Sequence, residues 1–454
     1  MSGSLRLAGG NRIALTVALD GAPAIVLEGP LADLDKLEQQ AAERVFAAVD
    51  PINDVLYLEV SGRTDDAMAQ AARAPQQVAA PIYRAVAYSL WAFETRRLTG
   101  NLALARQRIA LAIATDPKVA PAHIEIVREA SVLGHDEEEL QAARSLAHFR
   151  RQDQPLSMRG RGFDEIEYEA GSARDTETGD FQAAAGLVCG DLHPAAMALC
   201  ALYAARSRDA ARGRVLLVRA QAGGESDEAA IALARYYVDA DIGAWLAAVA
   251  DARQYLSVEK TQPRQSAKLS DLEARTRTLP LLAVATAETG DMAGAKALIA
   301  KAPPDCDACV RARGRIAAIA HDWTAAAHWF AVVSARSPDI PFADSDWGQM
   351  LLRKGDFDGA IAKFASANRK GAHFADPLEY WGEALIAKNR SDLALAKFAE
   401  ANKYAPNWGR LHLKWGEALL WIGDKAGAAK QFAVAAHLDL TPSEKSELAR
   451  VSHG

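Results

Sequence analysis

Two cysteines, Cys306 and Cys309, have a spacing that could support chemistry, in the segment Pro-Pro-Asp-Cys-Asp-Ala-Cys. Two thiols separated by two residues have the spacing of a redox dithiol. At the start of a helix, the helix N-terminus also lowers the pKa of a thiol. The flanking Asp305 and Asp307 oppose a thiolate, and no strand–helix–strand pattern surrounds the motif. We therefore expect small residues that pack between helices, with a disulfide or a redox pair as the alternative.

The other candidate patterns do not meet the requirements of a catalytic or metal site. A structural zinc site needs four ligands, and neither a second Cys-x-x-Cys nor a His-x-x-x-His pair occurs. The segment 186–190 lacks the Gly-x-Ser-x-Gly spacing of a hydrolase nucleophile. Four cysteines in so long a chain fit a reducing compartment, with Cys189 and Cys200 as core residues. The sequence therefore predicts a protein without a cofactor, a metal ion or enzymatic activity.

Charge and hydropathy narrow the class of protein further. The chain has 454 residues, a net charge of −6 and a pI near 6.0. Nucleic-acid binding needs a clustered basic surface, which the sequence lacks. No apolar run approaches the ~18 residues that span a bilayer, and the first residues lack the apolar core of a signal peptide. These features predict a cytoplasmic protein that binds neither nucleic acid nor membrane; with a coding start upstream of Met1, a membrane-anchored or periplasmic protein is the alternative.

An internal repeat of 34 residues is the strongest pattern in the chain. The dipeptide Trp-Gly occurs at 347–348, 381–382 and 415–416. Four further columns recur at the same spacing: Leu351, Leu385 and Leu419; Ala360, Ala394 and Ala428; Phe364, Phe398 and Phe432; Ala367, Ala401 and Ala435. A period of this length is typical of arrays in which each repeat is one supersecondary unit.

Within a repeat the spacing predicts a helical hairpin. Trp381, Gly382 and Leu385 form one stripe of a first helix, and Ala394 and Phe398 belong to a stripe of a second helix. The small residues let the two helices approach closely, with the phenylalanine between them. Gly-Asp at 355–356 and 423–424 has the residue types of a turn between helices.

These units resemble the tetratricopeptide repeat, which has a small residue at position eight, Ala at twenty, Phe at twenty-four, Ala at twenty-seven and Pro near thirty-two. The resemblance is close over residues 341–442, and a further unit at 307–340 keeps Gly314, Ala326, Phe330 and Pro338. One departure is the tryptophan at position seven, where the family more often has leucine. The resemblance implies an all-α protein, an α-solenoid of about eight to ten helical hairpins.

The first fifty residues have a different pattern. Apolar and polar residues alternate over 12–19, Asp20-Gly21 predicts a turn, and 24–28 is rich in β-branched residues, which together predict a β-hairpin. Apolar residues at helical spacing predict a helix over 34–49. A strand–turn–strand–helix before such repeats resembles the end of a TolB-like N-terminal module, which accompanies repeat arrays in bacterial signalling proteins.

These patterns divide the chain into five segments. A small β-hairpin and helix module covers 1–50, and repeats resembling the tetratricopeptide type cover 51–151. A stretch rich in Arg, Asp and Glu over 152–180 predicts a polar linker. The segment 181–265 has helical composition but loses the consensus, and the C-terminal array covers 266–454, with the strong repeats at 307–442.

The resemblance also implies a concave groove, which positions two, five, nine, twelve and thirteen of each unit would face. Phe342, Ser345 and Leu352 are among the residues carried onto these positions. The partner-binding residues predicted in this way are Gln349, Arg353, Glu379, Glu383, Arg410, Glu417 and Trp421. Three glutamates with an aromatic residue at one end favour a basic, partly apolar segment of another protein. The alternative is that Glu383 and Glu417 are ordinary helix surface.

The favoured function is a non-enzymatic scaffold that binds another protein in this groove, since repeat arrays present extended surfaces. One alternative is the regulatory or sensory repeat portion of a TolB-like or cyclase-associated signalling protein. A second is a redox protein that uses Cys306 and Cys309. A third is self-association through the last helix. The sequence leaves the partner and the oligomeric state open.

Overall fold

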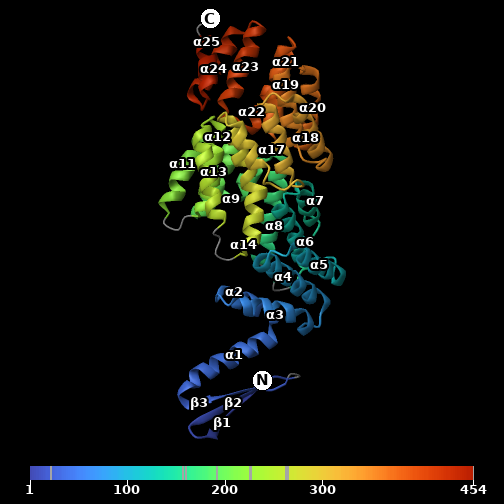
Figure 1. The fold of residues 1–454 in the computed structure, drawn as a ribbon, viewed down its shortest axis with the longest axis vertical. Coiled ribbons are helices and arrows are strands. Elements are labelled where there is room, and N and C mark those ends of the chain that lie inside the picture. Colours follow the sequence, from blue (N-terminus) through green and yellow to red (C-terminus); the bar gives the residue numbers. More distant parts are fainter. Residues whose placement is uncertain are drawn as a thin grey trace. The chain divides into compact units, whose positions relative to one another are not determined.

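The computed structural model describes residues 1–20, 23–155, 158, 161–190, 193–223, 227–260 and 265–452. The chain separates into two compact units, one of residues 1–125 and 149–163 and the other of residues 126–148 and 164–454. Helices dominate both units, and a small antiparallel sheet begins the chain (Figure 1). The predicted turn at Asp20-Gly21 falls partly outside the described residues.

The sheet at the start of unit 1 has one strand more than the sequence analysis predicted. Strands β1 (Ser2–Gly9), β2 (Arg12–Ala18) and β3 (Ile25–Pro30) pair antiparallel in the order β1-β2-β3. Helix α1 (Leu34–Val49) covers one face, where Ile13 and Leu27 pack with Leu37 and Ala41. The prediction missed β1 because this strand is exposed along its whole length and carries only two large apolar residues between glycine, serine and arginine.

The remainder of unit 1 is helical. A short 3-10 turn η1 (Leu31–Asp33) precedes α1, and η2 (Arg151–Asp153) lies in the second part of the unit. Its longer helices are α2 (Pro51–Val60), α3 (Thr64–Gln77), α4 (Pro81–Thr99) and α5 (Leu102–Thr115), followed by α6 (Ala120–Leu133), which continues into unit 2. Buried charges are paired here: Arg96 contacts Glu125 at 3.2 Å, and Arg97 contacts Glu94 at 2.7 Å.

Unit 2 is an array of antiparallel helical pairs, as the repeat predicted. Each of the following pairs packs side by side: α10 with α11, α12 with α13, α15 with α16, α17 with α18, α19 with α20, α21 with α22, and α23 with α24. The bounds are α7 (Asp136–Leu146), α8 (Arg161–Thr178), α9 (Phe181–Val188), α10 (Pro194–Arg206), α11 (Ala210–Ala222), α12 (Glu228–Asp241), α13 (Trp245–Glu259), α14 (Ala267–Glu273), the π-helical turn η4 (Ala274–Thr278), α15 (Leu279–Glu288), α16 (Met292–Ile299), α17 (Asp307–Ile319), α18 (Trp323–Arg336), α19 (Phe342–Lys354), α20 (Phe357–Lys370), α21 (Ala375–Ala387), α22 (Ser391–Tyr404), α23 (Gly409–Trp421), α24 (Lys425–His437) and α25 (Pro442–Ser452).

A repeated contact between glycine and phenylalanine joins the two helices of each strong repeat. A Cβ atom on Gly348 would lie 2.5 Å from a ring atom of Phe364, and Gly382 stands in the same relation to Phe398. Both rings are fully buried. Only glycine lets the first helix approach the ring this closely, which explains the Trp-Gly column of the sequence. We call these contacts the seam.

The turns between paired helices follow one design. Gly355 ends α19 with a φ of 86°, a left-handed conformation that glycine adopts without strain. The side chain of Asp356 then accepts a hydrogen bond of 3.0 Å from the backbone N–H of Gly359 and so caps α20. The same residue types stand at Gly179 and Asp180, where the Asp180 side chain caps α9.

The polar segment 152–180 is therefore not the linker that we predicted. Most of it is helix α8 (Arg161–Thr178), and α9 follows directly after the Gly-Asp turn. The segment 181–265, in which the consensus is lost, contains the regular pairs α10 with α11 and α12 with α13. Charged residues of the segment 152–180 form ion pairs with other helices of unit 2. The polarity of this segment therefore indicates contacts between helices and not a loop.

The C-terminal part of unit 2 returns to contact α9 and α11, and these contacts close the array. Hydrogen bonds across this closure are Arg208 Nε to Asp376 at 3.0 Å, Asn407 Nδ2 to Asp209 at 2.7 Å, Arg214 Nη2 to Asp439 at 2.8 Å and Gln182 Nε2 to the carbonyl oxygen of Tyr404 at 2.9 Å. The first helices of the pairs consequently surround a central space.

Candidate functional site: the central cavity

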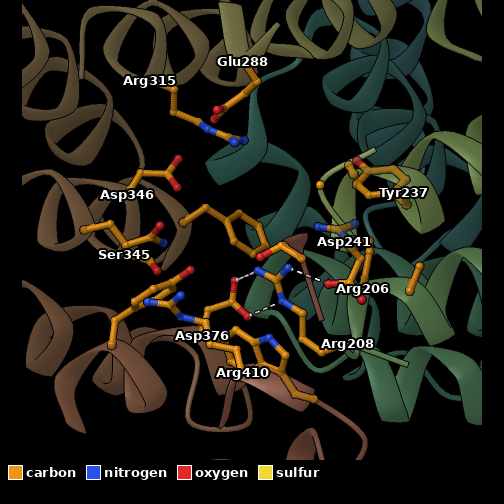
Figure 2. Close-up of a pocket in the computed structure, with 18 of the residues that line it drawn as sticks. Arg206, Arg208, Tyr237, Asp241, Glu288, Arg315, Ser345, Asp346, Asp376 and Arg410 are labelled. Atoms are coloured by element: carbon orange, nitrogen blue, oxygen red, sulfur yellow. Dashed lines mark hydrogen bonds and ion pairs between the residues drawn. The ribbon is translucent and has the colours of Figure 1, made fainter. Parts of the chain in front are cut away.

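The central space of unit 2 is a cavity of about 680 Å³. Its wall is formed by the first helices of successive pairs, α10, α12, α15, α17, α19, α21 and α23, together with the start of α25. Six arginines and seven carboxylates line it, beside aromatic rings from most of these helices. The concave face that the sequence predicted as a groove is thus the wall of a highly charged cavity (Figure 2).

One ion-pair cluster closes the ring. Arg208 donates hydrogen bonds to Asp241 at 2.8 Å and to Asp376 at 3.0 Å, and its guanidinium lies 4.8 Å from the ring centre of Trp408 (Figure 2). Burial raises the pKa of Asp241 to about 6, although the Arg208 charge opposes that rise. The Asp241 and Asp376 charges outweigh the burial of Arg208 and hold its pKa well above the usual value. This arginine therefore joins α10, α12 and α21.

A second cluster surrounds Arg410 on α23. Arg410 donates hydrogen bonds to Glu383 at 2.8 Å and to Glu444 at 3.1 Å, and lies 3.4 Å from the fully buried Glu379. Burial and the Glu383 charge raise the pKa of Glu379 well above its usual value. The pKa of Glu383 is lowered despite its burial, because the Arg410 charge and a hydrogen bond from protonated Glu379 favour the carboxylate.

The structure separates the predicted partner-binding residues into three groups. Gln349, Arg353, Glu383 and Arg410 line the cavity, as do Phe342, Ser345 and Leu352, which were carried onto the same register positions. Glu379 lies behind the wall, fully buried. The remaining two, Glu417 and Trp421, are not among the residues that line the cavity.

The acidic groove that we predicted does not exist as such. Glu383 bonds to Arg410, and Glu417 accepts a hydrogen bond of 3.1 Å from Lys414, which also bonds to Glu447 at 2.6 Å. A cation within the chain thus pairs with each of these glutamates, on the neighbouring helix or one turn away, so they are not free to bind a basic segment.

Besides Arg208, three further arginines of the cavity wall were not predicted from the sequence. The guanidinium of Arg206 lies 4.0 Å from the ring centre of Phe181 and 5.7 Å from that of Phe342. Arg311 lies 5.0 Å from the same Phe342 ring, and Arg315 follows one turn later on α17. The predicted concave positions of the tetratricopeptide register cover 341–442, and α10 and α17 lie outside that range. Extending the register to the unit at 307–340 would have placed Arg311 and Arg315 on the concave face.

A smaller cavity of about 400 Å³ shares part of this wall, including Arg206, Arg311 and Arg315. Three acidic residues line it. Burial and the charge of Asp307 raise the pKa of Asp136 to about 8, and burial raises that of Glu139 to about 7. Burial, with the charges of Asp136 and Glu139, raises the pKa of Glu177 well above its usual value. These acids hold protons near neutral pH.

The cysteines form two disulfides, Cys306 with Cys309 and Cys189 with Cys200. Cys306 and Cys309 are fully buried against the π-helical turn η4, where Cys306 Sγ lies 3.4 Å from the carbonyl oxygen of Thr276. The disulfide alternative for this pair matches the geometry. Cys200 is buried in the core, as predicted, and is bonded to the partly buried Cys189.

Within the described residues, no cluster of three or more histidine, cysteine or acidic side chains could hold a metal ion. None of the helices that the structure describes combines the length and the apolar character needed to cross a bilayer.

Comparisons with known proteins give a likeness of fold. No family model and no curated protein matches the chain. The structure is similar to the APC/C hetero-tetramer Cut9–Hcn1, with a TM-score of 0.52 and 12% identity over 93% of this chain and 82% of that chain. It also matches yeast Tom70 at a TM-score of 0.40, with 12% identity over 89% and 95%, and the human IFIT1 dimer with m7Gppp-AAAA at 0.45, with 11% over 73% and 80%. With its repeat register and the Cut9 likeness, the protein is a tetratricopeptide-type α-solenoid with a small N-terminal sheet.

Proposed function

We propose that this protein is a non-enzymatic scaffold that binds a segment of another protein inside the central cavity of unit 2. The observation that carries the proposal is that one cavity is lined by the first helix of every pair from α10 to α23. A site held by so many packed helices is rigid before a ligand arrives, which lowers the entropic cost of binding.

The size of the cavity limits what can enter it. A volume of about 680 Å³ lies within the 300–1,000 Å³ that is usual for ligand pockets. It accommodates a few side chains, so the partner contributes a short extended segment or a chain end and not a folded domain. Aromatic side chains and arginines are the residue types that dominate binding energy in such interfaces.

A peptide-display selection tests the proposal. A library of random twelve-residue peptides is selected on the folded protein and, in parallel, on a Gln349→Trp variant, whose indole would occupy the cavity. The matched control is Gln221→Trp on the exposed face of α11. We expect peptides that bind the wild type and the control equally and lose at least ten-fold in affinity for the cavity variant. Peptides that bind all three proteins equally, or no enrichment at all, would refute the proposal.

The disulfides support a second inference, about the compartment. Bonds between all four cysteines are typical of proteins that fold outside the reducing cytosol, so we propose an oxidising compartment. Alkylation of protein taken directly from its native cells, followed by mass spectrometry with and without reduction, tests this. Alkylation of all four thiols before reduction would refute the oxidising compartment and support the cytoplasm. The full burial of Cys306 and Cys309 argues against a role in thiol exchange, which needs an accessible sulfur.

A further inference from the structure

We propose that the central cavity recognises one oxyanion group, a carboxylate or a phosphate, on the bound peptide segment. This inference rests on the proposed function and names the chemistry of its ligand. It reverses the charge preference that the sequence suggested, and the reversal follows from which charged groups of the wall are already paired.

Most charges of the cavity wall satisfy one another. Arg208 and Arg410 are committed to Asp241, Asp376, Glu383 and Glu444, and Asp439 bonds to Arg214 from outside the cavity. Arg311 lies 3.4 Å from Asp346. Within the described chain, the charged wall residues with no ion pair of 4.0 Å or less are Arg206, Arg315, Arg353 and Glu288. Burial opposes the charged form of Arg315, but the charges of Asp346 and Glu288 still act on this residue and raise its pKa. These four residues carry a net charge of +2, a local excess within a wall whose other charges are paired, which suits one phosphate or one or two carboxylates.

The unpaired arginines are held where a ligand can reach them. Arg206 stacks on Phe181, and both Arg206 and Arg311 lie over the ring of Phe342. Figure 2 shows Arg315 and Ser345 on one side of the cavity and Arg206 on the opposite side. A guanidinium fixed on an aromatic face keeps its donors free in the ring plane, ready for bidentate contact with an oxyanion.

An independent observation comes from Ser345. Its side chain lines the cavity and is 2% exposed, yet its hydroxyl has no hydrogen-bond partner. A buried hydroxyl without a partner costs free energy, so such a group is expected where a ligand completes the bond. Ser345 lies one turn after Phe342 on α19, and both residues line the same cavity.

The same wall disfavours a polyanion. A nucleic-acid strand brings a negative charge at every nucleotide, and its binding sites are rich in unpaired basic residues. This wall has seven carboxylates against six arginines. One isolated oxyanion meets the local positive charge near Phe342, whereas the next phosphate of a strand would approach the acidic clusters around Arg208 and Arg410.

The test uses the peptides from the display selection. Each acidic residue of the tightest peptide is replaced by its neutral amide or by phosphoserine, and a version with an amidated C-terminus is also made. Isothermal titration calorimetry then measures Kd for the wild type and for the Arg206→Gln, Arg315→Gln and Ser345→Ala variants. The matched control is Arg219→Gln on the exposed face of α11.

We expect the neutral amide at one position, or the amidated C-terminus, to weaken binding at least ten-fold, and Arg206→Gln and Arg315→Gln to do the same. Ser345→Ala should weaken binding about three-fold while the protein unfolds at an equal or higher urea concentration, a combination that a purely structural serine would not give. The phosphoserine peptide distinguishes the two oxyanions, because tighter binding than the original identifies phosphate and weaker binding identifies carboxylate. Arg219→Gln should leave Kd unchanged.

Two results separate failure of this inference from failure of the proposed function. If the affinity of the selected peptides depends neither on their acidic groups nor on the arginine variants, the oxyanion inference is wrong and the scaffold proposal stands. A wild type that selects no peptide, yet binds a single-stranded RNA tetranucleotide in a manner lost with Arg315→Gln, would overturn both and identify a nucleic-acid site.

Discussion

In the seam between α21 and α22, Phe398 lies against Gly382, sixteen positions earlier in the same repeat. In the wall of the central cavity, Arg208 bonds to Asp376, 168 residues away. The seam is apolar, fully buried and repeated with the period of the sequence. The cavity wall is charged, and no two of its clusters are alike. Each repeat makes its own seam, whereas the wall exists only once the array has closed.

The difference shows where stability and function lie in this molecule. Burial of identical rings gives each helical pair its free energy locally, as in other repeat proteins. Burying charged groups in the wall costs desolvation free energy. The attraction between charges offsets this cost only where each charge has a partner. Wall residues that form no ion pair or hydrogen bond within the described part of the chain, Arg206 and Ser345 among them, are therefore the ones to examine for binding.

The largest effect is expected in the seam. Phe398→Ala removes a fully buried ring that touches Gly382 and leaves a cavity between α21 and α22. We expect the free energy of unfolding to fall by about 3–5 kcal/mol, the usual cost for buried aromatic residues. Urea unfolding followed by circular dichroism measures this change.

Leu393→Ala on the same helix is the matched control, because this side chain is 44% exposed. It should cost below about 1 kcal/mol. Equal effects of the two substitutions would show that the seam register is wrong.

The seam could be predicted from sequence because its signals are local and periodic. Gly382 and Phe398 recur every 34 residues, and the glycine and the ring are needed in every repeat. The linker prediction failed for the opposite reason. Over 152–180 the polarity of the residues predicted a linker, although Gly179-Asp180 has the residue types of the Gly355-Asp356 turn between helices.

The cavity could be predicted only in part. Register placed Gln349, Arg353 and Ser345 on the concave face, since that depends on helix periodicity alone. It could not show that Glu383 is neutralised by Arg410, because charge pairing between repeats depends on side-chain direction. Nor could it show Arg208 closing the ring, because a contact over 168 residues follows from the summed rotation of many repeats.

The next largest effect tests the closure. Arg208→Gln removes the charge that pairs with Asp241 and Asp376 and the stacking on Trp408. Because two partly buried carboxylates lose their partner, we expect the free energy of unfolding to fall by about 2–4 kcal/mol. Small-angle scattering should also record a larger radius of gyration.

Arg214→Gln is the control for this contact, since Arg214 crosses the same closure to Asp439 but its side chain is 45% exposed. Its effect should stay below about 1 kcal/mol, as for surface ion pairs. A wild-type radius of gyration in Arg208→Gln would show that the ring does not depend on this cluster.

A smaller effect is expected from pH. Asp136 and Glu139 have folded-state pKa values of about 8 and about 7, both raised chiefly by burial. Acids with raised pKa values stabilise the fold fully below their unfolded pKa, and this contribution is lost as pH rises through the folded pKa. Between pH 5 and pH 9 we therefore expect the free energy of unfolding to fall.

The Asp136→Asn, Glu139→Gln double variant should flatten this decline, and Glu138→Gln on the same helix should keep it. Urea unfolding at each pH measures all three proteins. Stability that rises over this range in the wild type would contradict the protonated state of the smaller cavity.

The smallest effect is expected at Trp421, which shares register position thirteen with Arg353. Arg353 lines the cavity because further helices continue the ring beside it, whereas Trp421 ends α23 and is 74% exposed. Removing an exposed ring frees no buried space, so Trp421→Ala should change the free energy of unfolding by less than about 0.5 kcal/mol. It should also leave the Kd of cavity-binding peptides unchanged in calorimetry, while Arg353→Ala weakens it. A ten-fold loss of affinity in Trp421→Ala would mean that partners bind along the outer end of the array. It would also mean that residues at the same register position have the same role in every repeat.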